Sequence, residues 1–130
     1  MKIFLDTIDL EEIKKYCEIF DVAGITTNPN LARRFGMSDD IEMVREIGKV
    51  IGNQKEIHVE AFGENSDEII QNSQRIKKNC SKYNLVFKIP FSEEGVKASK
   101  YLIGKKYSTN LHLIFSLSQA EIASSNNSNY

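Results

Sequence analysis

The stretch Leu85-Val86-Phe87-Lys88-Ile89-Pro90 places one lysine inside an otherwise apolar run. A short apolar run that ends at a proline is typical of a strand covered on both faces. Lysine is seldom fully buried unless it is paired or chemically useful. Burial favours the neutral amine, which is a nucleophile that can form a Schiff base with a carbonyl substrate. The alternative is a structural lysine whose stem crosses the strand layer or whose ammonium pairs with a carboxylate.

Length and composition are those of one packed domain, residues 1–130, with 41% apolar residues. We expect a soluble, cytoplasmic protein, because no apolar run is long enough to span a membrane and Asp6 interrupts the apolar N-terminus. The 17 basic and 18 acidic residues are scattered, so nucleic acid is not an expected partner. Cys17 and Cys80 stand alone, and neither a metal site nor a disulfide is expected.

Five strand-like runs alternate with helix-like segments, which indicates an α/β protein with a parallel sheet. The predicted strands are residues 2–6, 22–26, 56–62, 85–90 and 108–115. Residues typical of helix N-caps precede the helical segments. These predicted starts are Asp9, Asn28 before Pro29, Ser38 after a break near Gly36, Ser66, Ser92, and Ser116 with Gln119.

Along four of these strands the polar residues fall at even-numbered positions (one parity), whereas most apolar residues fall at odd-numbered positions (the other parity). Side chains of one parity point to the same face of the sheet. If the apolar parity packs against helices, the opposite face presents one group of side chains to a common interior: Asp6, Glu60, Lys88, Asn110 and His112. Most of them, with Thr26 and Asn28, come late in a strand or just after it, where βα-barrels place their chemistry.

Each residue of this group also has a simpler interpretation. Asp6 could cap the first helix, and Asn28 could be a plain N-cap. His58 and His112 could be packed imidazoles. An inward carboxylate at Glu60 costs several kcal/mol unless it is paired, and Lys88 is its natural partner.

Five motifs, in order and spread over the whole chain, resemble the transaldolase family, in particular its short branch that includes fructose-6-phosphate aldolases. The matching segments are residues 4–7 (FLDT), 24–31 (GITTNPNL), 59–61 (VEA), 87–90 (FKIP) with Glu94-Gly95, and 109–116 (TNLHLIFS) with Gln119-Ala120.

The resemblance implies a (β/α)₈ TIM barrel with Lys88 as the Schiff-base lysine and no cofactor. It implies Asp6 as the acid/base of retro-aldol cleavage and Glu60 as the group that acts through a water in carbinolamine dehydration. It also implies that Thr26, Asn28 and Asn110 hold substrate hydroxyls. The implied reaction transfers a dihydroxyacetone unit between sugar phosphates, as in the pentose phosphate pathway. Aldolases of this branch tend to have glutamine where this chain has Glu60, so Glu60 favours a transaldolase.

The chain departs from the family pattern at two places. His112 stands where the family has a threonine that positions the catalytic water, and an imidazole is larger and titrates. The family also continues beyond Tyr130 with further βα units and a phosphate-binding arginine, so we expect a partial barrel of about five units out of eight. An open edge at residues 108–115 would then favour a homo-oligomer or a second chain that completes the barrel. The alternative function is a catalytically inactive partial barrel that serves as an assembly or binding module.

Overall fold

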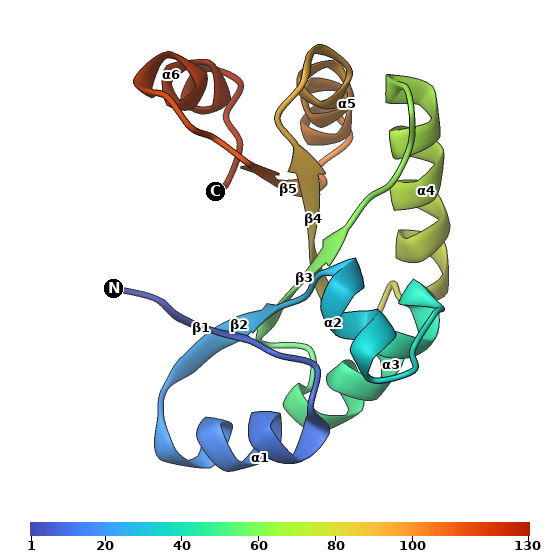
Figure 1. Ribbon diagram of the computed structural model, residues 1–130, viewed down its shortest axis with the longest axis vertical. Helices are drawn as coiled ribbons and strands as arrows, with labels where there is room; N and C mark the ends of the chain where they lie inside the picture. Colours follow the sequence, from blue (N-terminus) through green and yellow to red (C-terminus); the bar gives the residue numbers. More distant parts are fainter. The chain divides into compact units, whose positions relative to one another are not determined.

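A computed structural model describes residues 1–130, in which five strands alternate with six helices (Figure 1). The elements are β1 (Ile3–Asp6), α1 (Leu10–Ile19), β2 (Val22–Thr26), α2 (Pro29–Arg34), α3 (Asp40–Ile51), β3 (Glu56–Glu60), α4 (Ser66–Asn79), β4 (Asn84–Pro90), α5 (Glu93–Gly104), β5 (Ser108–His112) and α6 (Leu117–Ser125). The strand order is β1-β2-β3-β4-β5, the same as the order in the chain. This repetition of parallel βα units is that of a partial TIM barrel and confirms the predicted α/β class.

The chain forms two compact units. The first unit contains residues 1–59 and 76–85, and the second contains residues 60–75 and 86–130. The division passes through β3, α4 and β4, so that Glu60 and Lys88 belong to the second unit whereas Asp6, Thr26 and Asn28 belong to the first. A single domain over residues 1–130 stays a prediction.

In the first unit, β2 pairs in parallel with β1 and β3, with Asp6 opposite Thr26 and Thr26 opposite His58. Gly24 is required here by close approach, because a Cβ at this position would lie 2.4 Å from the Glu56 carbonyl oxygen. The core of this unit is apolar and consists of Ile13, Val22, Ile25, Val44, Ile47, Ile57, Val59, Ile76, Tyr83 and Leu85. Burial of such side chains contributes about 1.5–3 kcal/mol each.

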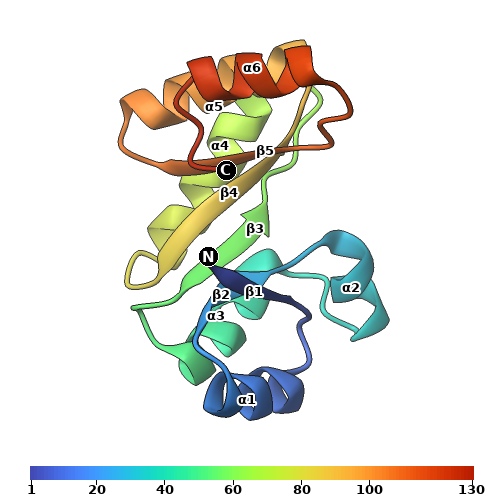
Figure 2. The same ribbon diagram turned by 90° about the vertical axis from the view of Figure 1, so that its left-hand side faces the viewer.

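In the second unit, β4 and β5 pair in parallel, with Lys88 opposite Asn110 and Pro90 opposite His112. Helices α5 and α6 lie on one side of β5 in both views (Figures 1 and 2). The core of the unit contains Ile69, Val86, Phe87, Ile89, Ala98, Leu102, Leu111 and Ala123. The apolar parity of β4 and β5 is therefore the buried one, as the alternation along these strands predicted.

Four of the six predicted helix starts are confirmed, because the side-chain oxygens of Asp9, Asn28, Ser92 and Ser116 accept hydrogen bonds from backbone N–H groups of the following turn. Helix α4 does begin at the predicted Ser66, but Ser66 is not its cap, and the prediction for Ser38 is wrong. Asp39 caps α3, and the side chain of Asn65 accepts from Glu68 N–H at 3.0 Å. In both places an Asx side chain one residue away is an equally good acceptor, and local sequence does not separate neighbouring candidates.

Strand β5 ends at His112 and not at the predicted Phe115, because Leu113 adopts a left-handed backbone conformation with φ of 62°. Strand β3 similarly ends at Glu60 and not at Phe62.

The expectation of an open edge at β5 is also wrong over part of the strand. Asn129 N–H donates to the Thr109 carbonyl at 3.0 Å, and Leu111 N–H donates to the Tyr130 carbonyl at 3.2 Å. Residues 128–130 therefore occupy the outer edge of β5 and pair backbone groups that were expected to be exposed.

Candidate active site

Lys88 lies in β4 between the fully buried side chains of Phe87 and Ile89, but its own side chain is only partly buried. The prediction of a strand buried on both faces holds at Val86, which is buried, but is wrong at Lys88 and Pro90, which are only partly buried near the end of β4. The backbone of Lys88 has a neighbouring strand on each side. Asn110 pairs with it in register, and the Ala61 N–H donates to the Lys88 carbonyl at 2.9 Å.

Glu60 and His112, which the sequence places in one group with Lys88, contact each other in the second unit. His112 Nε2 lies 3.4 Å from Glu60 Oε1, and the two side chains are 19% and 14% exposed. This separation satisfies the distance for an ion pair but is longer than a good N–H···O hydrogen bond, and His112 Nε2 has no other hydrogen-bond partner. The structure thus confirms that the polar side chains Glu60 of β3 and His112 of β5 lie on one face.

Asp6 and Thr26 form the corresponding pair in the first unit, where the Thr26 hydroxyl donates to Asp6 Oδ1 at 2.8 Å. Asp6 does not cap α1, since Asp9 Oδ1 accepts from the N–H groups of Glu11 and Glu12. The simpler interpretation of Asp6 as a helix cap is therefore wrong. Its side chain is instead directed to the neighbouring strand.

Asn28 serves as the N-cap of α2, with Oδ1 accepting from Leu31 N–H at 3.0 Å and Pro29 at the first helical position. The interpretation of Asn28 as a helix cap is confirmed. The cap uses only the amide oxygen, so the amide nitrogen can still donate to a ligand.

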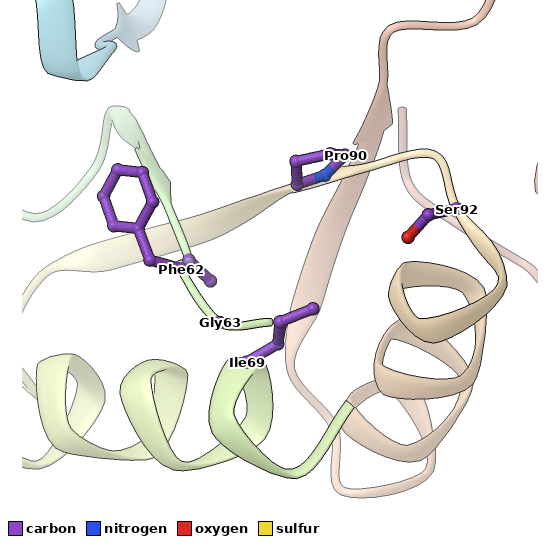
Figure 3. Close-up of a pocket in the computed structure, with 6 residues that line it drawn as sticks. Phe62, Gly63, Ile69, Pro90 and Ser92 are labelled. Atoms are coloured by element: carbon purple, nitrogen blue, oxygen red, sulfur yellow. The ribbon is translucent and has the colours of Figure 1, made fainter. Parts of the chain in front are cut away.

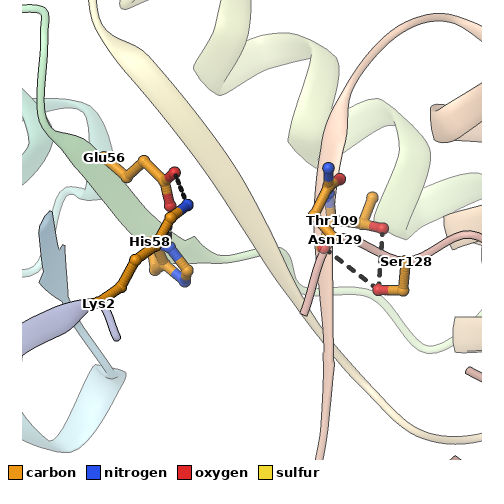
Figure 4. A network of polar contacts seen from close by, with 6 residues as sticks. All are labelled: Lys2, Glu56, His58, Thr109, Ser128 and Asn129. Atoms are coloured by element: carbon orange, nitrogen blue, oxygen red, sulfur yellow. Dashed lines mark hydrogen bonds and ion pairs between the residues drawn. The ribbon is translucent and has the colours of Figure 1, made fainter. Parts of the chain in front are cut away.

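His58 shares the polar parity but is a buried structural residue, 1% exposed. Its Nε2 lies 3.0 Å from Glu56 Oε2, and Glu56 Oε1 pairs with Lys2 Nζ at 3.1 Å (Figure 4). The Phe4 ring packs edge-on against the imidazole at 4.9 Å. These contacts confirm the interpretation of His58 as a packed imidazole.

A second polar network in the same figure joins β5 to the C-terminal residues of the second unit (Figure 4). The Ser128 hydroxyl lies 3.3 Å from the Thr109 hydroxyl, and the latter lies 3.0 Å from the buried Ser99 hydroxyl of α5. Thr109 N–H donates to Asn129 Oδ1 at 3.0 Å. The network holds residues 128–130 against the outer edge of β5, and it gives Thr109 a structural role.

A small pocket of about 100 Å³ opens where β3 and β4 end, and sequence reasoning did not find it (Figure 3). It is lined by Ala61, Phe62, Gly63, Ile69, Pro90 and Ser92. Ligand pockets commonly measure about 300–1,000 Å³, so this pocket is too small to hold a sugar phosphate by itself. A Cβ at Gly63 would lie 2.5 Å from the Ile69 nitrogen, which explains why this lining residue is a glycine.

The start of α5 carries the most strongly perturbed carboxylate of the second unit. The hydrogen bond from Lys97, followed by the one from the Ser66 backbone, lowers the pKa of Glu94 to about 2. Glu94 Oε2 accepts from Ser66 N–H at 2.8 Å and so satisfies a free donor at the start of α4. This carboxylate stabilises the loop that follows β3.

Parallel βα units with a lysine, a glutamate, an asparagine and a histidine on three successive strands are those of a partial TIM-barrel-like α/β protein with a candidate amine-based site. Residues 3–130 match the model of the Transaldolase/Fructose-6-phosphate aldolase family, and the chain belongs to this family.

Similar proteins carry both names of the family. A probable transaldolase of Lactiplantibacillus plantarum is 38% identical over 130 residues, which are 100% of this chain and 58% of that protein. A probable transaldolase of Clostridium perfringens is 39% identical over 123 residues, and a probable fructose-6-phosphate aldolase of Streptococcus pneumoniae is 30% identical over 123 residues. Both of these alignments cover 95% of this chain and 55% of the relative. The chain thus spans little more than half the length of these relatives. None of its helices has the length and apolar character needed to cross a membrane.

Proposed function

We propose that this chain carries the Schiff-base part of a transaldolase-type active site, which transfers a dihydroxyacetone unit from a ketose phosphate to an aldose phosphate, as in the pentose phosphate pathway. The observation that carries the proposal is the arrangement around Lys88, a partly buried amine in register with Asn110 and on the strand next to Glu60. Family membership supports this reaction class.

In this proposal Lys88 Nζ attacks the ketose carbonyl to form a carbinolamine, and loss of water gives the imine. Dehydration needs a proton donor for the leaving hydroxyl, and we assign this role to the Glu60 carboxyl, acting through a water, at the end of a strand next to that of Lys88. Asn110, which pairs in register with Lys88, would hydrogen-bond a substrate hydroxyl in this proposal.

Carbon–carbon cleavage requires a base that takes a proton from the substrate hydroxyl. We assign this role to Asp6, whose Oδ1 is held by the Thr26 hydroxyl while Oδ2 takes no part in that hydrogen bond. Thr26 then orients the base, and Asn28 offers its amide nitrogen to substrate. The relatives are nearly twice as long, so further βα units, in the same chain or in a second chain, would complete the site.

Imine trapping tests the proposal. Dihydroxyacetone and borohydride should add a reduced adduct to Lys88, detectable by peptide mass spectrometry. Lys88→Met should abolish the adduct, whereas Lys100→Met, which removes an exposed lysine of α5, should leave it unchanged. Labelling spread evenly over surface lysines, or none in the wild type, would refute the Schiff-base assignment.

A second candidate is a fructose-6-phosphate aldolase, favoured by the similarity to the probable aldolase of Streptococcus pneumoniae. The two reactions differ in the fate of the three-carbon unit. With fructose 6-phosphate as donor and an aldose phosphate as acceptor, a transaldolase moves the unit to the acceptor, whereas an aldolase releases dihydroxyacetone. Glu60 supports the transaldolase.

A further inference from the structure

The imidazole of His112 carries a buried polar atom that lacks a hydrogen-bond partner. Its Nε2 is inaccessible to solvent, and the carboxylate oxygen Glu60 Oε1 lies 3.4 Å from it. Leaving a buried donor or acceptor unpaired costs about 1–3 kcal/mol. A shift of a few tenths of an ångström that brings Nε2 and Oε1 within hydrogen-bond distance is therefore favourable. The geometry therefore points to an Nε2–H that donates to the glutamate.

Both residues are held by backbone pairing. Pro90 pairs with His112 in register, and Phe91 N–H donates to the His112 carbonyl at 2.8 Å. Glu60 is fixed by the neighbouring Ala61 N–H, which donates to the Lys88 carbonyl. A contact between two strand residues is more precisely placed than one between loops, which suits an orienting role.

The ionisable groups around this pair come from two strands. Glu60 faces the imidazole from β3, and Lys88 lies on the same parity of β4, two residues before the partner of His112. At the start of α5, Glu94 is already engaged by Lys97 and Ser66 N–H. Glu60 is thus the carboxylate with which His112 interacts.

We propose that His112 is a positioning residue for Glu60. Its Nε2–H donates to Oε1, restrains the carboxylate to one rotamer, and leaves Oε2 for the reacting group on Lys88. A threonine at this position, which the family resemblance implies, is too short to contact the carboxylate in this way. The inference rests on the proposed function for its catalytic meaning, although the contact itself does not depend on it.

The contact is tested by nitrogen-15 NMR on histidine-labelled protein. The chain has two histidines, and His58, whose Nε2 is paired with Glu56, serves as an internal control for folding. We expect His112 to be the Nε2–H tautomer with a proton that exchanges slowly with water. Glu60→Leu should abolish that protection at His112 and leave the His58 signals unchanged. An Nδ1–H tautomer at His112, or signals indifferent to Glu60→Leu, would overturn the proposal.

The catalytic role is tested by the rate of imine trapping at Lys88. His112→Gln keeps a donor near the position of Nε2, whereas His112→Leu removes it. We expect trapping to slow about tenfold in His112→Leu and to stay within about threefold of wild type in His112→Gln, as for loss of one hydrogen bond to a charged group. Equal rates in the two variants would refute a positioning role. If wild type forms no imine, the proposed function fails together with this role, while the histidine signals still decide the contact.

Discussion

The Thr26 hydroxyl donates a hydrogen bond of 2.8 Å to Asp6 Oδ1 across the paired strands β1 and β2. Thr26→Val keeps the shape of the side chain and removes the donor. Because Asp6 is exposed to solvent, we expect the free energy of unfolding to fall by only about 0.5–1 kcal/mol in urea titrations. Thr26→Ser should retain wild-type stability more closely, and an equal loss in both variants would mean that the methyl group and not the hydrogen bond matters.

Asp6→Asn separates imine formation from carbon–carbon cleavage. If Asp6 is the base of the cleavage step, the variant should still trap dihydroxyacetone on Lys88 with borohydride. Cleavage of fructose 6-phosphate should slow by about 10²–10⁴-fold, the usual contribution of a general base. Asp9→Asn, at the cap of α1, is the matched control because asparagine caps a helix as well as aspartate. Wild-type cleavage by Asp6→Asn would remove Asp6 from the mechanism.

Glu94 should make the free energy of unfolding depend on pH in the acidic range. Its hydrogen bonds from Lys97 and Ser66 lower the pKa to about 2 in the folded chain, whereas an unfolded glutamate titrates near about 4.3. A carboxyl whose pKa is lower in the folded than in the unfolded chain stabilises the fold at pH values above its unfolded pKa. This stabilisation is lost as the pH falls toward the folded pKa of about 2.

The measurement is the unfolding free energy of wild type and Glu94→Gln as a function of pH. The variant should be less stable than wild type at pH values well above the unfolded pKa, and the difference should shrink as the solution is acidified. Glu93→Gln is the control, because Glu93 pairs with Lys97 but not with Ser66. A difference that is independent of pH would contradict the role of the ionised carboxylate.

Gly95 and Gly104, both in α5, should respond oppositely to alanine. A Cβ at Gly95 would lie 2.1 Å from the Pro90 carbonyl oxygen, so Gly95→Ala must displace backbone and should cost about 1–3 kcal/mol. A Cβ at Gly104 meets nothing within 4 Å, and Gly104→Ala should gain up to about 1 kcal/mol from helix propensity. Denaturant titration of the two variants checks the contrast. A stabilised Gly95→Ala would show that the β4–α5 connection is looser than in the structure.

Leu113 is a strained position, because it combines a φ of 62° with a bulky side chain. The left-handed region costs an L-residue about 1–2 kcal/mol, and this side chain is 54% exposed, so it gains little from packing. Leu113→Gly should therefore leave the free energy of unfolding unchanged or raise it by up to about 1 kcal/mol. Ile122→Gly, at an exposed position inside α6, should lower it. A large loss in Leu113→Gly would indicate that its side chain is needed.

Short-range signals in the sequence determined most of the elements of this protein. Asp9, Asn28 before Pro29, and Ser92 mark helix starts, since each cap joins groups only two or three residues apart and needs nothing else in the fold. The two-residue alternation along β4 likewise put Phe87 and Ile89 in the core and Lys88 on the other face. These features follow from local geometry, and five motifs were enough to identify the family.

Only the tertiary structure decided contacts between residues far apart in the chain. Glu94 satisfies the start of α4 from a position 28 residues away, and residues 128–130 pair with the edge of β5. The sequence could place Glu60 and His112 on one face, but their approach to 3.4 Å depends on the register of the strands that carry them. The physical reason is that a side-chain contact across strands is set by backbone hydrogen bonds between distant segments, and local propensity carries no information about them.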